Sequence, residues 1–99
     1  MRSLSAKECC VLELLAARGE LYGLELVGAS GGALKRGTVY VTLARMEEKG
    51  LVAGELERDA APHPGLPRRV YRPTALGLKL LEAQRAFAAA LMAPAKGRA

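Results

Sequence analysis

The chain has 99 residues, of which 51% are hydrophobic, 25% are charged and only 4% are aromatic, and its net charge is +5. This length allows one domain with a modest and mostly aliphatic core, and this composition excludes a disordered chain. Because no signal peptide is evident and no apolar run approaches the about 18 residues of a membrane-spanning helix, we expect a cytoplasmic protein with no membrane partner.

The positive charge is unevenly distributed along the chain. Residues 1–34 carry three cations and four anions, whereas residues 35–99 carry twelve cations and six anions. The basic excess therefore begins near residue 35 and continues to the end. This pattern favours a face that binds a polyanion such as nucleic acid, although solubility alone can also explain a basic protein.

The first helix is predicted from a capping box, Ser5-Ala6-Lys7-Glu8. In this motif the serine hydroxyl accepts a hydrogen bond from the amide three residues on, and the glutamate carboxylate reaches back. The helix is expected to run to about Arg18 and to end at Gly19. It is apolar on more than half of its circumference, which indicates a central position.

Two cysteines, Cys9 and Cys10, are adjacent in this helix. Neighbouring helical residues point about 100° apart, so the pair is poorly placed to form a disulfide or to bind one metal ion together. We interpret both as small packing residues in a reducing compartment, and a redox switch is the alternative.

A second, short helix is predicted over about Leu21 to Ala29, buried through Leu24, Leu26 and Val27. The residues Ser30-Gly31-Gly32 end it, since glycine accepts positive φ.

The third helix is predicted within the stretch from Lys35 to Gly50, which ends on a glycine typical of a helix terminus. Val39, Leu43 and Met46 form the apolar stripe of a helix packed on a core. The opposite face offers hydroxyls, cations and one branched apolar side chain, which suit phosphate oxygens and base edges in a major groove: Thr38, Val41, Thr42, Arg45 and Lys49. Lys35 and Arg36 add charge just before it.

Two helices joined by a tight glycine-containing turn, with a basic outer face on the second, are typical of a helix-turn-helix motif. An ordinary surface helix with a basic face is the alternative interpretation.

After residue 50 the hydrophobic period changes from 3.6 to 2. Residues 51–57 and 69–72 are predicted to pair as antiparallel strands, with Val52 and Leu56 on one face. The segment between them contains three prolines and one glycine, so we expect a projecting loop, or wing. The arginines around the loop favour contact with DNA over an unpartnered surface loop: Arg58, Arg68 and Arg69.

A final helix is predicted from Ala75 to about Met92, capped by Thr74. It carries two apolar stripes, one of Leu76, Leu80, Ala83, Phe87 and Leu91, and a second of Leu78, Leu81 and Ala88. A small domain needs only one stripe covered, so we expect a homodimer. The pattern leaves open which stripe faces the partner, and Phe87 and Leu91 are our choice. The organisation expected is a DNA-binding domain over 1–73, a dimerisation helix over 74–93 and a short basic tail over 94–99.

The chain offers no enzymatic constellation. His63, the single histidine, lies in the proline-rich loop with no acid or thiol beside it, and no nucleotide-binding loop, nucleophile elbow or zinc-ligand spacing is present. We therefore expect no enzyme, and neither a cofactor nor a metal site.

These segments resemble the PadR-like transcriptional regulators, a family of bacterial winged-helix proteins, over about residues 8 to 82. The matching residues are Val11-Leu12-Glu13-Leu14-Leu15, Leu21-Tyr22-Gly23-Leu24-Glu25-Leu26, the signature Gly37-Thr38-Val39-Tyr40-Val41-Thr42-Leu43 with Arg45-Met46-Glu47-Glu48-Lys49-Gly50-Leu51-Val52, and Arg69-Val70-Tyr71-Arg72-Pro73-Thr74 followed by Gly77. Two positions depart from the family pattern. Val41 stands where a proline is usual and Pro73 where a leucine is usual, and we expect Pro73 to shorten the second strand.

The resemblance implies a mainly α fold with a small β-hairpin (α+β): a winged helix-turn-helix with three N-terminal helices, a two-stranded wing and a C-terminal dimerisation helix. It also implies a dimeric DNA-binding repressor, often with a small-molecule effector pocket near the dimer interface. Thr38, Tyr40, Thr42 and Arg45 match family positions at or near the DNA backbone and groove. The alternative is a winged-helix module whose basic face binds an acidic protein, and the salt dependence of binding to duplex DNA would separate the two.

Overall fold

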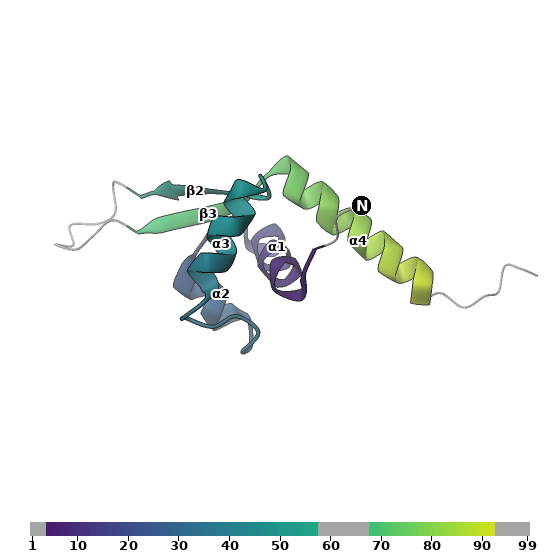
Figure 1. The fold of residues 1–99 in the computed structure, drawn as a ribbon, viewed down its shortest axis with the longest axis horizontal. Coiled ribbons are helices and arrows are strands. Elements are labelled where there is room, and N and C mark those ends of the chain that lie inside the picture. Colours follow the sequence, from purple (N-terminus) through teal and green to yellow (C-terminus); the bar gives the residue numbers. More distant parts are fainter. Residues whose placement is uncertain (1–3, 58–67, 93–99) are drawn as a thin grey trace, which may run out of the picture.

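The computed structural model describes residues 4–57 and 68–92. In chain order they form α1 (Ala6–Arg18), β1 (Leu21–Tyr22), α2 (Gly23–Ala29), α3 (Val39–Glu48), β2 (Val52–Leu56), β3 (Arg69–Pro73) and α4 (Ala75–Met92). In Figure 1, α1 lies between the α2–α3 pair and α4, and strands β2 and β3 project on the side away from α4. The predicted winged-helix fold is confirmed.

Helix α1 begins and ends where its local sequence predicts. The Ser5 hydroxyl accepts from the Glu8 N–H at 3.1 Å, and the Glu8 carboxylate accepts from the Ser5 N–H at 2.9 Å. At the other end Gly19 has φ +89° and its N–H donates to the Leu15 carbonyl. Val11, Leu12 and Leu15 are completely buried, so α1 is central to the core.

Helix α2 is shorter than expected because Leu21 and Tyr22 form a strand instead. The Glu25 carboxylate accepts from the Tyr22 N–H at 2.8 Å and so caps the helix start. Leu26 is buried as predicted, but Leu24 is 49% exposed, and the prediction that it is buried was wrong. Two positions along a helix turn a side chain by about 200°, so a short helix that buries Leu26 directs Leu24 outward.

Helix α3 confirms the predicted stripe, since Val39, Leu43 and Met46 are all 0% exposed. Gly50 follows the helix with φ +77°, and the Leu51 N–H then donates to the Met46 carbonyl at 2.8 Å. This glycine-dependent turn directs the chain from α3 into β2.

The sheet has three antiparallel strands in the order β1-β3-β2, so β1 adds a third strand to the predicted pair. Leu21 pairs with Tyr71, and Val52 pairs with Pro73. The expectation that Pro73 shortens its strand was wrong. It is the last residue of β3, and the next N–H, that of Thr74, donates to the Leu51 carbonyl at 3.1 Å. The hydrogen bonding between β3 and the β2 side of the sheet therefore continues past Pro73, although proline has no backbone N–H to donate.

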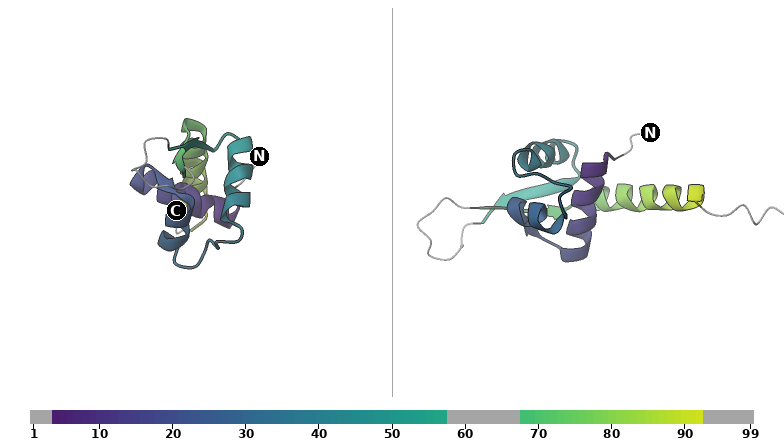
Figure 2. Two further views of the ribbon diagram at one scale, coloured as in Figure 1. Left: turned by 90° about the vertical axis from the view of Figure 1, so that its left-hand side faces the viewer. Right: turned by 90° about the horizontal axis from the view of Figure 1, so that it is seen from below.

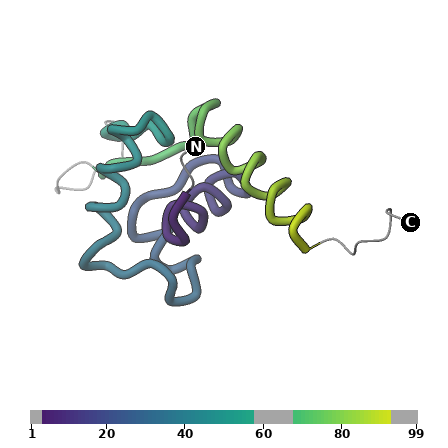
Figure 3. The backbone as a smooth tube through the Cα atoms, turned by 45° about the vertical axis from the view of Figure 1, so that its right-hand side comes forward, coloured from purple at the N-terminus to yellow at the C-terminus, as the bar shows by residue number. Residues whose placement is uncertain are grey.

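Helix α4 is capped by Thr74 and spans the predicted range, Ala75–Met92. The Thr74 hydroxyl accepts from the Gly77 N–H at 3.0 Å and donates to the Gly50 carbonyl at 2.6 Å. Leu81 is 1% exposed in the core, whereas Phe87 and Leu91 are 66% and 70% exposed. Figures 2 and 3 show the second half of α4 extending away from the rest of the molecule.

Leu80, placed by the sequence on the same stripe as Phe87, packs partly against the core of its own domain. The division into a domain over 1–73 and a helix over 74–93 stays a prediction, and the tail 94–99 lies outside the described residues. Among the helices that the structure describes, none combines the length and the apolar character needed to cross a membrane.

Candidate nucleic-acid interface

The outward face of α3 presents the side chains that the sequence assigned to it. Thr38, Val41 and Arg45 are exposed and Thr42 is half-buried. The Thr42 hydroxyl donates to the Thr38 carbonyl at 3.3 Å, which leaves its oxygen lone pairs able to accept a further bond. Val41 is 52% exposed, so its branched apolar side chain is accessible for contact. The face therefore combines a cation, hydroxyls and an apolar contact.

Tyr40 lies to the side of this face and has a structural contact. A Cβ atom placed on Gly23 would lie 2.5 Å from a carbon of the Tyr40 ring, so the absence of a side chain at the start of α2 makes room for the ring. The ring is 47% exposed. Tyr40 thus packs α3 on α2 and still reaches solvent.

Lys35 and Arg36 lie in the turn before α3, and both are exposed. The Lys35 carbonyl accepts from the N–H groups of Thr38 and Val39, at 3.1 and 2.9 Å. This turn holds the two cations beside the helix start.

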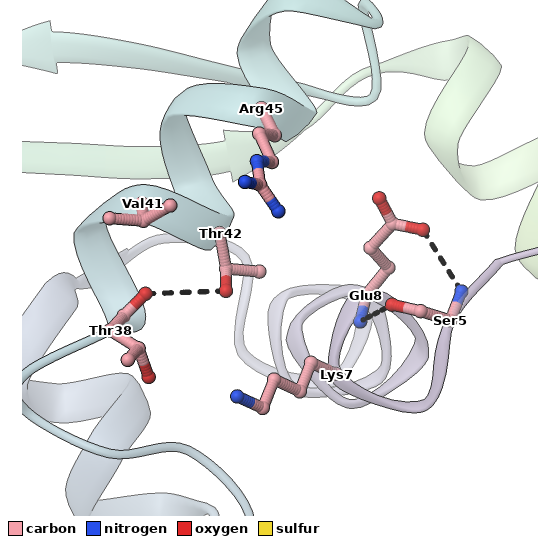
Figure 4. Close-up of a pocket in the computed structure, with 7 residues that line it drawn as sticks. All are labelled: Ser5, Lys7, Glu8, Thr38, Val41, Thr42 and Arg45. Atoms are coloured by element: carbon pink, nitrogen blue, oxygen red, sulfur yellow. Dashed lines mark hydrogen bonds between the residues drawn. The ribbon is translucent and has the colours of Figure 1, made fainter.

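An open pocket of about 240 Å³ separates the start of α1 from α3, lined by Ser5, Lys7, Glu8, Thr38, Val41, Thr42 and Arg45. Figure 4 shows the Arg45 guanidinium and the Lys7 ammonium entering this space from opposite helices. Two cations and two threonine side chains therefore line one pocket between α1 and α3. The sequence had predicted the α3 residues of this surface but not the contribution of α1.

Lys49 is the predicted DNA-binding residue whose surroundings differ most from expectation. Its ammonium contacts the Glu8 carboxylate at 2.5 Å. Glu8 is only 7% exposed, so this ion pair joins the end of α3 to the start of α1. Burial raises the pKa of Glu8, but the hydrogen bonds from Lys49 and Ser5 outweigh burial and lower it overall. A role for Lys49 at DNA phosphates stays a prediction, and the contact indicates that it positions α3.

Replacing Lys49 with methionine is expected to lower the free energy of unfolding by about 1–2 kcal/mol, because Glu8 loses its partner while it stays largely buried. This value lies between those of exposed and buried ion pairs, since the Lys49 side chain is 37% exposed. The pKa of Glu8 is lowered by folding, so the stabilisation is present above the pKa of an unfolded glutamate, about 4.3, and is lost as the pH falls through the lower value in the folded protein.

Urea unfolding of the wild type and of the Lys49→Met protein, at neutral and at acidic pH, measures this effect. The exposed Lys79 of α4, changed to methionine, is the control for the lost charge. If Lys49→Met and Lys79→Met lose the same free energy of unfolding at neutral pH, the positioning role of Lys49 is contradicted.

The arginines at the base of the wing are held by neighbouring groups. Arg68 lies over the ring of Tyr22, with its guanidinium carbon 4.1 Å from the ring centre. Arg69 donates to the Glu47 carboxylate at 3.1 Å and to the Gly54 carbonyl at 3.3 Å. These contacts join the wing to β1 and to α3. Arg58 lies outside the described residues.

Sequence reasoning missed the second role of Glu8 and the place of Lys7. The capping box identified Glu8, but only as a partner of Ser5. Its pairing with Lys49 spans 41 positions, and no local pattern indicates such a contact. Lys7 lies within the capping box, but only Ser5 and Glu8 form the hydrogen bonds of that motif. No feature of the sequence therefore indicated a role for Lys7.

The cysteines pack as predicted. Both are free, half-buried and packed against the core, and burial raises the pKa of each thiol. The Gln84 amide of α4 donates to the Cys9 sulfur at 3.0 Å. Within residues 4–57 and 68–92 no three histidine, cysteine or acidic side chains gather as metal ligands would, and His63 lies outside this part of the chain.

Comparison with known proteins gives a consistent result. The chain matches the transcriptional regulator PadR-like family over residues 11–83. A PadR family regulator from Eggerthella lenta DSM 2243 is similar in structure, with a TM-score of 0.71 and 31% identity over 85% of this chain and 72% of that one. A PadR-like transcription factor from Bacteroides fragilis has a TM-score of 0.73 and 25% identity, over 85% of this chain and 81% of that one. Among curated proteins no significant sequence match was found.

A third structure, of a PadR family transcription regulator from Clostridium difficile R20291, has a TM-score of 0.70 and 26% identity, and the match covers 89% of this chain and 95% of that one. The family match includes α3, the strands of the wing and the first half of α4. The regulators of this family bind DNA and are not enzymes. The chain belongs to the PadR-like family of transcriptional regulators.

Proposed function

We propose that this DNA-binding regulator acts as a dimeric repressor that inserts α3 of each subunit into the major groove of a two-fold operator. The observation that carries the proposal is the outward face of α3, where an exposed guanidinium, hydroxyls and an exposed valine surround the mouth of the pocket. This combination suits base edges and the thymine methyl group as well as phosphates.

The side chains divide by their position on this surface. Val41 and Thr42 lie on the middle of α3 and are proposed to contact base edges, and the guanidinium of Arg45 can reach a guanine or a phosphate from there. Phosphates are proposed for the residues at its borders, which are Lys35, Arg36, Thr38, Tyr40 and Lys49, and for Arg68 and Arg69 at the base of the wing. The same role for Arg58, which lies outside the described residues, stays a prediction. Cations at the edge of a groove fix the register of a protein on the duplex and carry little sequence information.

The second half of α4 supports the dimer. Phe87, Leu91 and Met92 are each at least 66% exposed, and Leu76 is 48% exposed. Such side chains on one projecting helix are favourably buried by a second copy of the same helix. We therefore propose the interface at Leu76, Ala83, Phe87 and Leu91, with Leu80 at its border.

Repression follows from occupancy, since a dimer bound across promoter DNA excludes other proteins from it. Release from DNA by a small-molecule effector, which the family resemblance implies, stays a prediction, as does a cytoplasmic location.

The second candidate is a basic module that binds an acidic protein, and it is favoured only by the net charge. An electrophoretic shift assay on DNA from upstream of the protein's own gene, repeated at several salt concentrations, separates the two. Phosphate contacts make the affinity for duplex DNA fall steeply with salt. Indifference to duplex DNA at low salt would remove the repressor proposal.

Replacing Arg45 with alanine is expected to weaken binding to the operator by about 1–3 kcal/mol per half-site, because the exposed guanidinium loses its contact with a guanine or a phosphate. Fluorescence anisotropy with operator and with unrelated DNA measures the change. The control is Arg18→Ala, which removes an exposed arginine from the far end of α1. Wild-type affinity in a folded Arg45→Ala protein would refute the assignment.

A further inference from the structure

We propose that Lys7, on the first turn of α1, is a DNA-contacting residue, and that it holds one backbone phosphate together with Thr38 and Arg45 of α3. The proposal rests on the DNA-binding role proposed above and extends the interface from α3 to a second helix. It assigns a ligand to the pocket of Figure 4, which is lined on one side by α1 and on the other by α3.

The geometry of the pocket supports this role. In Figure 4 the Lys7 ammonium extends from α1 toward the Thr38 end of α3, while Arg45 directs its guanidinium into the same space from above. Thr38 also lines the pocket, whereas the Thr42 hydroxyl is already engaged as a donor to the Thr38 carbonyl. Ammonium, guanidinium and hydroxyl groups are the side-chain donors that bind phosphate oxygens, and here they come from both walls.

The charges of the neighbouring groups favour an anion in this pocket. Glu8 also lines it, but its carboxylate is occupied by the Ser5 N–H and by the Lys49 ammonium. Lys7 is exposed and forms no ion pair with the acids of the described residues, and the same holds for Arg45. Two uncompensated cations therefore share the pocket, and their mutual repulsion is relieved when a phosphate binds between them.

The position relative to α3 indicates phosphate rather than a base. When a recognition helix occupies a major groove, the sugar-phosphate backbones run along its two sides. Lys7 comes from the helix packed beside α3, so it reaches the border of the groove and not its floor. As a flexible point charge, lysine suits a phosphate without requiring a fixed geometry.

The test is the salt dependence of operator binding by Lys7→Gln. One lost phosphate contact reduces the slope of log affinity against log salt by about 0.9, so a two-fold dimer should lose about two units in slope. Preference for the operator over unrelated DNA should stay unchanged, and Lys7→Arg should restore the slope. The control is Lys79→Gln, which removes the same charge from an exposed position on α4.

A second measurement locates the phosphate. Operator duplexes in which single phosphates are replaced by neutral methylphosphonates should show one position per half-site where the Lys7→Gln protein loses less affinity than the wild type does, because only the share of the contact made by Lys7 is already gone. A slope equal to that of wild type in Lys7→Gln, or additive losses at every phosphate, would overturn the role of Lys7 while leaving the repressor proposal intact. Failure of the wild type to bind any duplex would overturn both.

Discussion

Replacing both Phe87 and Leu91 with glutamate is expected to give a folded monomer whose affinity for the operator is reduced by about a hundredfold or more. The two side chains are 66% and 70% exposed, so the fold of one subunit does not need them. Burying each one is worth roughly 1.5–3 kcal/mol, and a two-fold interface buries four. Four charges in their place prevent association.

The loss of DNA affinity follows from symmetry. A dimer binds two half-sites about one DNA turn apart, whereas a monomer keeps the contacts of a single α3. Light scattering measures the mass of each protein, and anisotropy on the intact operator measures the affinity. Thermal unfolding of the variant checks that the subunit remains folded.

A matched control places the same charges elsewhere on α4. Ala86 and Ala89 are exposed, and helical geometry turns them about 100° or more away from Phe87 and Leu91. Changing both to glutamate should leave the dimer intact. The dimer proposal fails if the wild type is a monomer at micromolar concentration, or if the Phe87 and Leu91 variant binds the operator as tightly as the wild type.

Replacing Gly77 with alanine is expected to destabilise the fold by about 3 kcal/mol. A Cβ atom at this position would lie 2.2 Å from the Leu51 carbonyl oxygen and 3.0 Å from the Leu12 side chain. The Leu51 carbonyl cannot withdraw easily, because it accepts from the Thr74 N–H at 3.1 Å where α4 begins. Overpacking against a fixed backbone costs about 1–3 kcal/mol and occasionally more.

Gly28 in α2 provides the control for this substitution. A Cβ atom there meets nothing within 4 Å, so alanine should stabilise the helix by up to about 1 kcal/mol. Urea unfolding at one fixed protein concentration compares the two variants, since association also contributes to stability. A Gly77→Ala protein as stable as the wild type would show that α4 can shift away from α1 and β2 at little cost.

Local sequence patterns were sufficient for most of the fold. The capping box at Ser5, the glycines at positions 19 and 50, and the stripe of Val39, Leu43 and Met46 are confirmed by the structure. Each pattern depends on contacts between residues a few positions apart, and such contacts can be deduced from spacing alone. The same reasoning identified the outward face of α3.

Contacts between distant segments were decided only by the tertiary structure. Strand β1 has two residues, too few for a period to show, and it exists because β3 offers it a pairing edge. The sequence left open which stripe of α4 faces a partner, with Phe87 and Leu91 as the choice, and the structure places Leu81 in the core and Phe87 in solvent. Residue spacing cannot distinguish these cases, because it does not say which neighbour covers a given face.

The electrostatics of the interface show the same division. The number and order of the cations were evident from the sequence, and so was the basic face of α3. Which cations pair with carboxylates inside the fold was not evident, because Lys49 and Arg69 contact carboxylates 41 and 22 positions away, while Lys7 faces α3 across the pocket. An ion pair of this kind depends on how helices and strands pack, which the local pattern of charge does not contain.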